Sequence, residues 1–239
     1  MSARFEELDF QQTRMGELIL RRRTEPGTGT GTTIYEVKLE EEFLMSSLFT
    51  VAEEEMSRIG LAAATGERLD VLVGGLGLGY TAATALADDR VQRLHVIDAL
   101  PAVIGWHERK LLPVSAQLVE DPRTTLRHDD FFAVVRQAPE PDALSYDVIL
   151  LDVDHSPRHT LDPSHADLYT AEGLDALSHH LKDHGVFTLW SDDPVDEDFF
   201  SILESVFDDC AAHLVEFPNH LTARTSSNTV YVGIKRPLG

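Results

Sequence analysis

The chain has 239 residues, of which 43% are hydrophobic, enough to bury the core of one domain of moderate size. Its 41 acidic residues against 20 basic ones give a formal charge of −21, which disfavours binding to the phosphate backbone of DNA or RNA. No apolar run approaches the roughly 20 residues of a membrane span, and Met1–Phe10 lacks the pattern of a signal peptide, so we expect a cytoplasmic protein with neither membrane nor nucleic-acid partners.

The N-terminal part of the chain has the alternating pattern of a β-hairpin. Apolar and polar residues alternate over Glu17–Arg22 and Ile34–Leu39, on either side of the turn-rich stretch Pro26–Gly31. After the hairpin, the spacing of apolar residues predicts an amphipathic helix over Ser46–Ala64, with Ser46 or Ser47 as its N-cap. A small β element followed by a linking helix is therefore predicted.

From Leu69 onward, short apolar runs alternate with segments of helical periodicity. This alternation is typical of a parallel sheet covered by helices, in which ligands bind at the edge formed by the C-terminal ends of the strands. We therefore divide the chain into residues 1–66, the hairpin and helix, and residues 67–239, a Rossmann-like domain. The predicted strands are Asp70–Val73, Leu94–Asp98, Thr124–Arg127, Asp147–Asp152, Val186–Trp190 and Thr229–Ile234, and the predicted helices are Thr81–Ala87, Pro101–Leu111, Phe131–Gln137, Ala166–Leu181 and Asp196–Asp208.

A glycine-rich turn follows the first of these strands. It contains Gly74, Gly75, Gly77 and Gly79, and a helix is predicted directly after it. Because glycine has no Cβ, the backbone of such a turn can approach a ligand closely. The spacing differs from the Gly-x-Gly-x-x-Gly of dinucleotide-binding enzymes, since Tyr80 stands where the third glycine would be. S-adenosylmethionine is therefore favoured over NAD as the cofactor.

Carboxylates follow the next two predicted strands. Asp98 comes about twenty residues after the glycines, where an acid can bind ribose hydroxyls, although it could instead cap the helix that starts near Pro101. After the third strand, Asp129, Asp130 and Phe131 stand where an adenine would be hydrogen-bonded and stacked. Either acid would also serve as a helix N-cap, and the ring as core packing. We prefer Asp130 to Asp129.

The fourth strand ends in the densest group of ionisable residues. Asp152, Asp154 and His155 could accept a proton from an amine or attract a cation, and we take Asp152 as the first catalytic candidate and Asp154 as the second. After the fifth strand, Asp192 and Asp193 are candidates for an acceptor pocket, although the latter could simply start a helix. The histidines of the loop after strand four match no familiar ligand spacing, so we expect no metal.

Several short motifs occur along the chain in one order. They are Gly16-Glu17-Leu18 and Tyr35-Glu36, Asp98 with Val103-Ile104, Asp121-Pro122-Arg123, the acids at 129 and 130, Tyr146–Asp152, and Leu168-Tyr169 before Leu181-Lys182-Asp183-His184-Gly185-Val186. In this order they resemble the spermidine synthase (aminopropyltransferase) family, which has the class I S-adenosylmethionine-dependent methyltransferase fold. The resemblance implies an α/β, Rossmann-like domain with a mostly parallel seven-stranded sheet and a small N-terminal β-hairpin element.

The resemblance also implies an activity. Members of that family transfer an aminopropyl group from decarboxylated S-adenosylmethionine to a small amine, and two acids three residues apart hold the amine and act as base. Asp152 matches the first acid, whereas His155 occupies the second position, and Leu78 stands where the glycine loop usually carries an aspartate. Tyr169 is a substrate-binding candidate, and a homodimer is expected. Two alternatives stay open: an S-adenosylmethionine-dependent small-molecule methyltransferase, and a non-catalytic nucleoside-binding protein.

Overall fold

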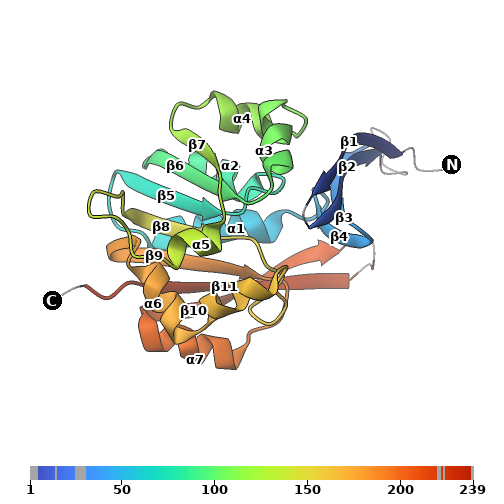
Figure 1. Cartoon of the computed structure of the whole chain (residues 1–239). Helices are drawn as coiled ribbons and strands as arrows, with labels where there is room; N and C mark the ends of the chain where they lie inside the picture. The colour runs from blue at the N-terminus through green and yellow to red at the C-terminus, as the bar shows by residue number, and fades with distance from the viewer. Residues whose placement is uncertain (1–4, 14, 25–30, 220–221, 223, 238–239) are drawn as a thin grey trace.

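The structure is a computed structural model that describes residues 5–13, 15–24, 31–219, 222 and 224–237. These residues form a small antiparallel sheet near the N-terminus and a large sheet that follows it (Figure 1). The small sheet consists, in spatial order, of β1 (Phe5–Thr13), β2 (Gly16–Thr24), β3 (Thr33–Leu39) and β4 (Glu42–Ser46). The large sheet consists, in spatial order, of β10 (Asp208–Asn219), β11 (Arg224–Ile234), β9 (Leu181–Ser191), β8 (Tyr146–Leu151), β5 (Leu69–Gly74), β6 (Val91–Asp98) and β7 (Thr124–His128).

In the large sheet, β9, β8, β5, β6 and β7 run parallel, β11 pairs antiparallel with β9, and β10 pairs antiparallel with β11. β5 is buried along its whole length, as expected of a central strand that helices cover on both faces. The predicted α/β class, with a mostly parallel seven-stranded sheet, is therefore confirmed. Because the parallel strands share one direction, their C-terminal ends meet at a single edge, where the predicted site residues lie.

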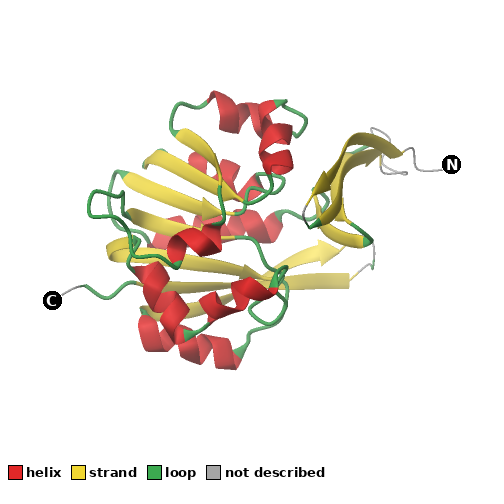
Figure 2. Ribbon diagram, in the orientation of Figure 1, coloured by secondary structure: helices red, strands yellow, loops and turns green. Residues whose placement is uncertain are grey.

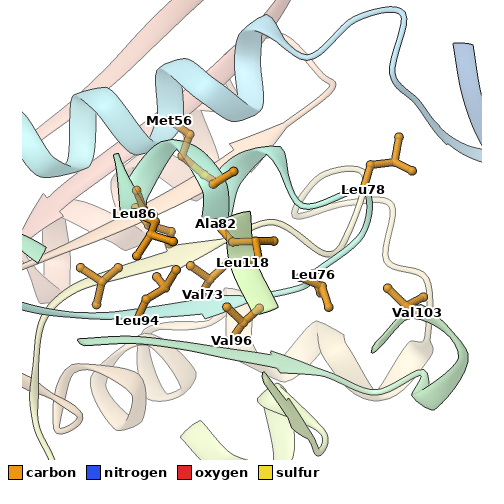
Figure 3. Packing of buried hydrophobic residues seen from close by; sticks show 14 of the residues in the cluster. Met56, Val73, Leu76, Leu78, Ala82, Leu86, Leu94, Val96, Val103 and Leu118 are labelled. Atoms are coloured by element: carbon orange, nitrogen blue, oxygen red, sulfur yellow. The ribbon is translucent and has the colours of Figure 1, made fainter. Parts of the chain in front are cut away.

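Helices cover both faces of the large sheet (Figure 2). One hydrophobic core includes side chains from α1 (Val51–Ala63), α2 (Tyr80–Leu86), α3 (Pro101–Glu108) and α4 (Ser115–Glu120). The other includes side chains from α5 (Phe131–Val135), the 3-10 helix η1 (Pro163–Tyr169), α6 (Ala171–Ser178) and α7 (Glu197–Val206). Figure 3 shows the first core, in which Met56 of α1 and Ala82 and Leu86 of α2 lie above Val73 and Leu94 of the sheet. No helix among the described residues is long and apolar enough to cross a membrane.

The N-terminal sheet is larger than the predicted hairpin. The antiparallel pairing of β2 with β3 confirms the hairpin, whose predicted turn, Pro26–Gly31, lies outside the described residues except for its last position. Both β1 and β4 were missed, and the helix expected from Ser46 onward starts only at Val51. The predicted serine cap is wrong: the Ser47 Oγ instead accepts a hydrogen bond from the Tyr35 backbone N–H at 2.9 Å, which ties the chain after β4 to β3.

Two differences occur in the C-terminal half. The continuous helix predicted over Ala166–Leu181 is wrong, because η1 ends at Tyr169 and the Thr170 hydroxyl then caps α6 by accepting from the Gly173 N–H at 3.1 Å. The chain after α7 forms β10, which was missed because its burial does not alternate along most of its length. The proposed domain boundary after residue 66 stays a prediction; α1, which it assigns to the N-terminal part, packs against α2 and β9.

A polar contact joins the small sheet to α3, in addition to the apolar side chains of the small sheet that belong to the first core. Asp9 of β1 accepts a hydrogen bond from the Trp106 indole N–H at 2.7 Å and pairs with Arg109 at 2.9 Å. The Trp106 side chain is fully buried. Burial opposes ionisation of Asp9, but hydrogen bonds from Arg109 and Trp106 outweigh it, so that the pKa of this carboxyl is lowered. This contact holds the small sheet against α3.

Replacing Asp9 with alanine is expected to lower the free energy of unfolding by about 1–3 kcal/mol, because the buried indole N–H would lose its acceptor. Urea denaturation followed by tryptophan fluorescence measures the change. Gln12→Ala, at an exposed position of the same strand, is the control and should stay within about 0.5 kcal/mol of the parent protein. Equal free energies in the two variants would contradict the anchoring role of Asp9.

Candidate active site

The glycine-rich turn between β5 and α2 is closely packed from several sides. Gly75, Gly77 and Gly79 have φ angles of 91°, 46° and 90°, in the left-handed region that side chains other than glycine rarely adopt. A Cβ on Gly75 would lie 2.0 Å from the backbone oxygen of Asp152, so no side chain fits there without moving the end of β8. A Cβ on Gly74 would lie 2.7 Å from the Phe131 ring. The absence of side chains at these glycines therefore lets the turn pack closely against Asp152 and Phe131, and ligand binding by its backbone stays a prediction.

His107 of α3, which the sequence analysis missed, contacts this turn through a hydrogen bond. The Nε2 of His107 lies 3.0 Å from the Gly77 carbonyl oxygen, and its Nδ1 lies 3.2 Å from the Ser115 Oγ. The side chain is fully buried, and this burial lowers the pKa of the ring. A neutral ring that donates from Nε2 to the carbonyl and accepts the serine proton at Nδ1 satisfies both contacts. His107 therefore stabilises the conformation of the turn at Gly77.

Asp98 at the end of β6 connects the turn with the start of α3. One carboxylate oxygen accepts a hydrogen bond from the Leu76 N–H at 2.9 Å, and the other accepts from the Leu100 N–H at 2.8 Å. Burial raises the pKa of Asp98, against the opposing effect of these backbone amides. Each oxygen keeps acceptor capacity for a further hydrogen bond. The alternative that Asp98 caps α3 is wrong, because Leu100 is the N-cap and no side chain caps this helix. Asp98 instead orders the chain before α3, and it also lines a cavity.

That cavity is the larger of two at this edge of the sheet, with a volume of about 360 Å³. Gly75, Gly77 and Asp98 form one side of it, and Asp130 and Phe131 form another. Its walls are mostly apolar and include residues from both sheets, so the small sheet is part of the site. The remaining lining residues are Met15, Leu39, Leu44, Met45, Ile97, Ala99, Leu100, Val103, Phe132, Asp152, Val153, Leu161, Asp162, Ser164 and His165.

The two acids after β7 differ in their surroundings. Asp130 caps α5, because its Oδ1 accepts from the Ala133 N–H at 3.2 Å, and it also lines the larger cavity beside Phe131. Asp129 lines neither cavity and pairs instead with Arg127. The geometry therefore favours Asp130 over Asp129, in the order that the sequence analysis gave them.

Asp152, directly after β8, lies where the two cavities adjoin. It lines both the larger cavity and a second, smaller one of about 90 Å³. Its Oδ2 accepts a hydrogen bond from the Thr81 hydroxyl at 2.5 Å, which orients the carboxylate. Burial raises the pKa of Asp152 to about 6, so the carboxyl titrates near neutral pH. The remaining acids, aromatic rings and histidine of the smaller cavity are Glu53, Tyr80, Trp190 and His155.

Asp154 and Tyr169 lie elsewhere than the sequence analysis expected. Asp154 is 1% exposed; it accepts from the Tyr169 hydroxyl at 2.7 Å and lies 2.8 Å from Nδ1 of His165. Neither Asp154 nor Tyr169 lines the two cavities. The chain leaves the strand geometry after Leu151, and Asp154 then turns inward to hold the loop that follows. We therefore retain neither residue in the proposed reaction.

The acids after β9 are also engaged in local contacts. Asp192 accepts from the Asn228 side-chain amide at 2.7 Å, and Asp193 lies 3.0 Å from Nδ1 of His159. Neither acid lines the larger or the smaller cavity. His155, in contrast, lines the smaller cavity, and its carbonyl oxygen accepts from the Asp192 N–H at 2.7 Å. In the described part of the chain, no group of three metal-ligating side chains is arranged to hold a metal ion.

Glu53 of α1 is an ionisable residue of the site that the sequence analysis missed. It lines the smaller cavity, and burial together with the charge of Asp152 raises its pKa to about 8. Helical spacing could have found it, because position 53 shares a helix face with the buried Met56, Ser57 and Gly60. Acids rarely lie on the face of a helix that packs against the core, and one that does is a candidate for a functional residue.

Comparisons with known proteins agree with this architecture. A family model described as "Spermine/spermidine synthase domain" matches residues 50–214. The match includes α1, the glycine-rich turn and the C-terminal ends of β5, β6, β7, β8 and β9. No match was found among curated protein sequences.

Solved structures of low sequence identity share the fold. A spermidine synthase from Thermotoga maritima has 18% identity and a TM-score of 0.70, with 96% of this chain and 72% of that chain covered. A spermidine synthase in complex with the transition-state analogue AdoDATO has 20% identity and a TM-score of 0.73, with coverages of 96% and 73%. Human methyltransferase-like protein 13 in complex with SAH has 18% identity and a TM-score of 0.57, with coverages of 78% and 83%.

Gly75→Ala is expected to destabilise the protein by at least about 2 kcal/mol, because the new Cβ would collide with the Asp152 carbonyl oxygen in a backbone conformation that alanine disfavours. Gly105→Ala in α3 is the matched control: nothing lies within 4 Å of the added Cβ, and alanine favours a helix. Thermal unfolding of both variants measures the difference. A Gly75 variant as stable as the Gly105 variant would contradict the close packing of the turn.

Proposed function

The chain belongs to the spermine/spermidine synthase domain family, and we propose that it transfers an aminopropyl group from decarboxylated S-adenosylmethionine to a small amine. The observation that carries this proposal is the charge of the two adjoining cavities. Their lining includes Glu53, Asp98, Asp130, Asp152 and Asp162, and no lysine or arginine among the described residues. Such a site favours cationic ligands, and both the donor and an amine acceptor are cations.

The larger cavity suits the nucleoside part of the donor. Gly75 and Gly77 offer backbone without side chains, and the Asp98 carboxylate lies beside them with acceptor capacity for ribose hydroxyls. Asp130 and the Phe131 ring would hold the adenine. The donor's sulfonium supplies a carbon that is activated for attack by a nucleophile.

Asp152 would then act as the base of the reaction. It lines both cavities, so a group bound in the smaller one and a group bound in the larger one both reach it. The Thr81 hydroxyl holds its carboxylate in one orientation. Transfer requires an acceptor nitrogen in line with the donor carbon and a base for the proton that this nitrogen loses. Asp152 supplies the base, and the walls of the smaller cavity supply the alignment.

The small-molecule methyltransferase remains the second candidate, since the fold is shared with methyltransferases. The charge of the site favours aminopropyl transfer over it: the carboxylate of S-adenosylmethionine would meet acids and no basic partner in the described lining. The homodimer and the cytoplasmic location stay predictions of the sequence analysis.

Isothermal calorimetry is expected to give an affinity for decarboxylated S-adenosylmethionine at least about tenfold above that for S-adenosylmethionine, because only the latter brings an unpaired carboxylate into an acidic cavity. The reverse preference, with methyl transfer to an amine, would replace our proposal with the methyltransferase. Tight binding of both compounds without turnover across a panel of amines would favour the non-catalytic nucleoside-binding protein.

Asp152→Asn is expected to lower kcat by at least about a hundredfold while leaving nucleoside binding unchanged, because the amide cannot accept the proton. In the parent enzyme, kcat/KM for the amine should fall as pH decreases through about 6, since the base is then protonated. Steady-state kinetics and calorimetry with 5′-methylthioadenosine measure the two effects. Turnover at the parental rate in the variant would remove Asp152 from the mechanism.

A further inference from the structure

The smaller cavity contains an acid from an element that carries no other group of the site. Glu53 lies in the first turn of α1, whereas Asp152 and His155 come from the loop after β8. The two carboxylates of this cavity therefore approach it from different layers of the fold. Tyr80 and Trp190 add aromatic rings to the wall, and such rings favour a cation.

Glu53 differs from the two acids that follow it in the sequence. Glu54 and Glu55 both pair with Arg58 on the outer face of α1, at 2.7 Å and 2.6 Å. Glu53 has no side-chain hydrogen-bond partner among the described residues, and its carboxyl is bonded only to its own backbone amide. A half-buried carboxylate without a hydrogen-bond donor from another residue is costly unless a ligand or a proton neutralises it.

The charged groups that shift the pKa of Glu53 are all acidic, and His155 is the one basic side chain in the described lining of the same cavity. Asp152 of the β8 loop, Asp192 of the β9 end and Glu54 of its own helix each raise its pKa, and burial raises it most. Tyr80 of α2 lines the same cavity, and burial raises its pKa, so it stays a neutral phenol there. The carboxyl pair therefore holds a proton at neutral pH before any cation arrives.

We propose that Glu53 is a second amine-binding residue of the acceptor site: Glu53 and Asp152, which line the smaller cavity from different elements, together bind one ammonium group there. The ammonium group displaces the proton that the two carboxyls hold at neutral pH. The inference rests on the proposed function. The proton goes to the solvent, and the ammonium group replaces its charge. Amine binding is therefore coupled to proton release, and this coupling makes the cavity selective for a cation over a neutral group of the same size.

The test uses 1,4-diaminobutane as the probe and calorimetry of the intact protein near neutral pH, in phosphate and in Tris, whose ionisation enthalpies differ. The difference in heat between the buffers gives the number of protons released, expected to approach about one for the parent protein. Glu53→Gln should release less than about half as many and bind the diamine at least about tenfold more weakly. Glu55→Gln, which changes an adjacent acid on the outer face of the helix, is the matched control and should behave as the parent.

Binding of 5′-methylthioadenosine to all three proteins reports whether each is folded, because the larger cavity does not include Glu53. Glu53→Asp, which keeps the charge, should recover part of the diamine affinity and of the proton release. The inference is overturned if Glu53→Gln keeps the parental diamine affinity, or if the parent releases no proton on binding. If the parent protein transfers the aminopropyl group and Glu53→Gln has the same diamine affinity and proton release, this inference fails and the proposed function stands. A parent that binds the nucleoside but neither binds nor alkylates any amine defeats the proposed function as well.

Discussion

The contact between the glycine-rich turn and the end of β8 is the constraint on which the site depends. The Gly75 N–H donates to the Ile97 carbonyl at 2.9 Å, and the Asp152 N–H donates to the Gly74 carbonyl at 2.8 Å, so hydrogen bonding between neighbouring strands continues to the edge of the sheet. No side chain fits between Gly75 and the Asp152 backbone. This contact places the proposed base directly beside the backbone that is proposed to hold the donor. The order of the strands thereby determines which acid can take part in the reaction.

Much of the fold could be predicted because its signals are local. The apolar strands, the glycine spacing and the acids at strand ends follow from short stretches of sequence, and they predict that Asp98, Asp130 and Asp152 lie at one edge of the sheet. The elements that were missed lack such signals. β10 shows little alternation, and the break between η1 and α6 depends on a single hydroxyl at Thr170 that caps a helix.

The site was harder to predict than the fold, because it depends on where side chains point. Asp154 is two residues beyond Asp152, yet it turns into the protein and pairs with Tyr169. Glu53 lies far from the strand ends in sequence and reaches the cavity only because α1 packs on the large sheet. Sequence position alone predicts neither that Asp154 lies outside the cavities nor that Glu53 lines one of them. The helix face shared with Met56 was the one sequence signal that indicated burial of Glu53.

Both cavities share Leu44 and Met45, which come from β4 of the small sheet, and that sheet is held to α3 through Asp9. The small sheet thus forms part of the wall of both cavities. A ligand in either cavity contacts β4. Binding in one cavity should therefore alter the rate at which a ligand enters or leaves the other. The order in which donor and amine bind would then depend on the N-terminal sheet as well as on the Rossmann-like domain.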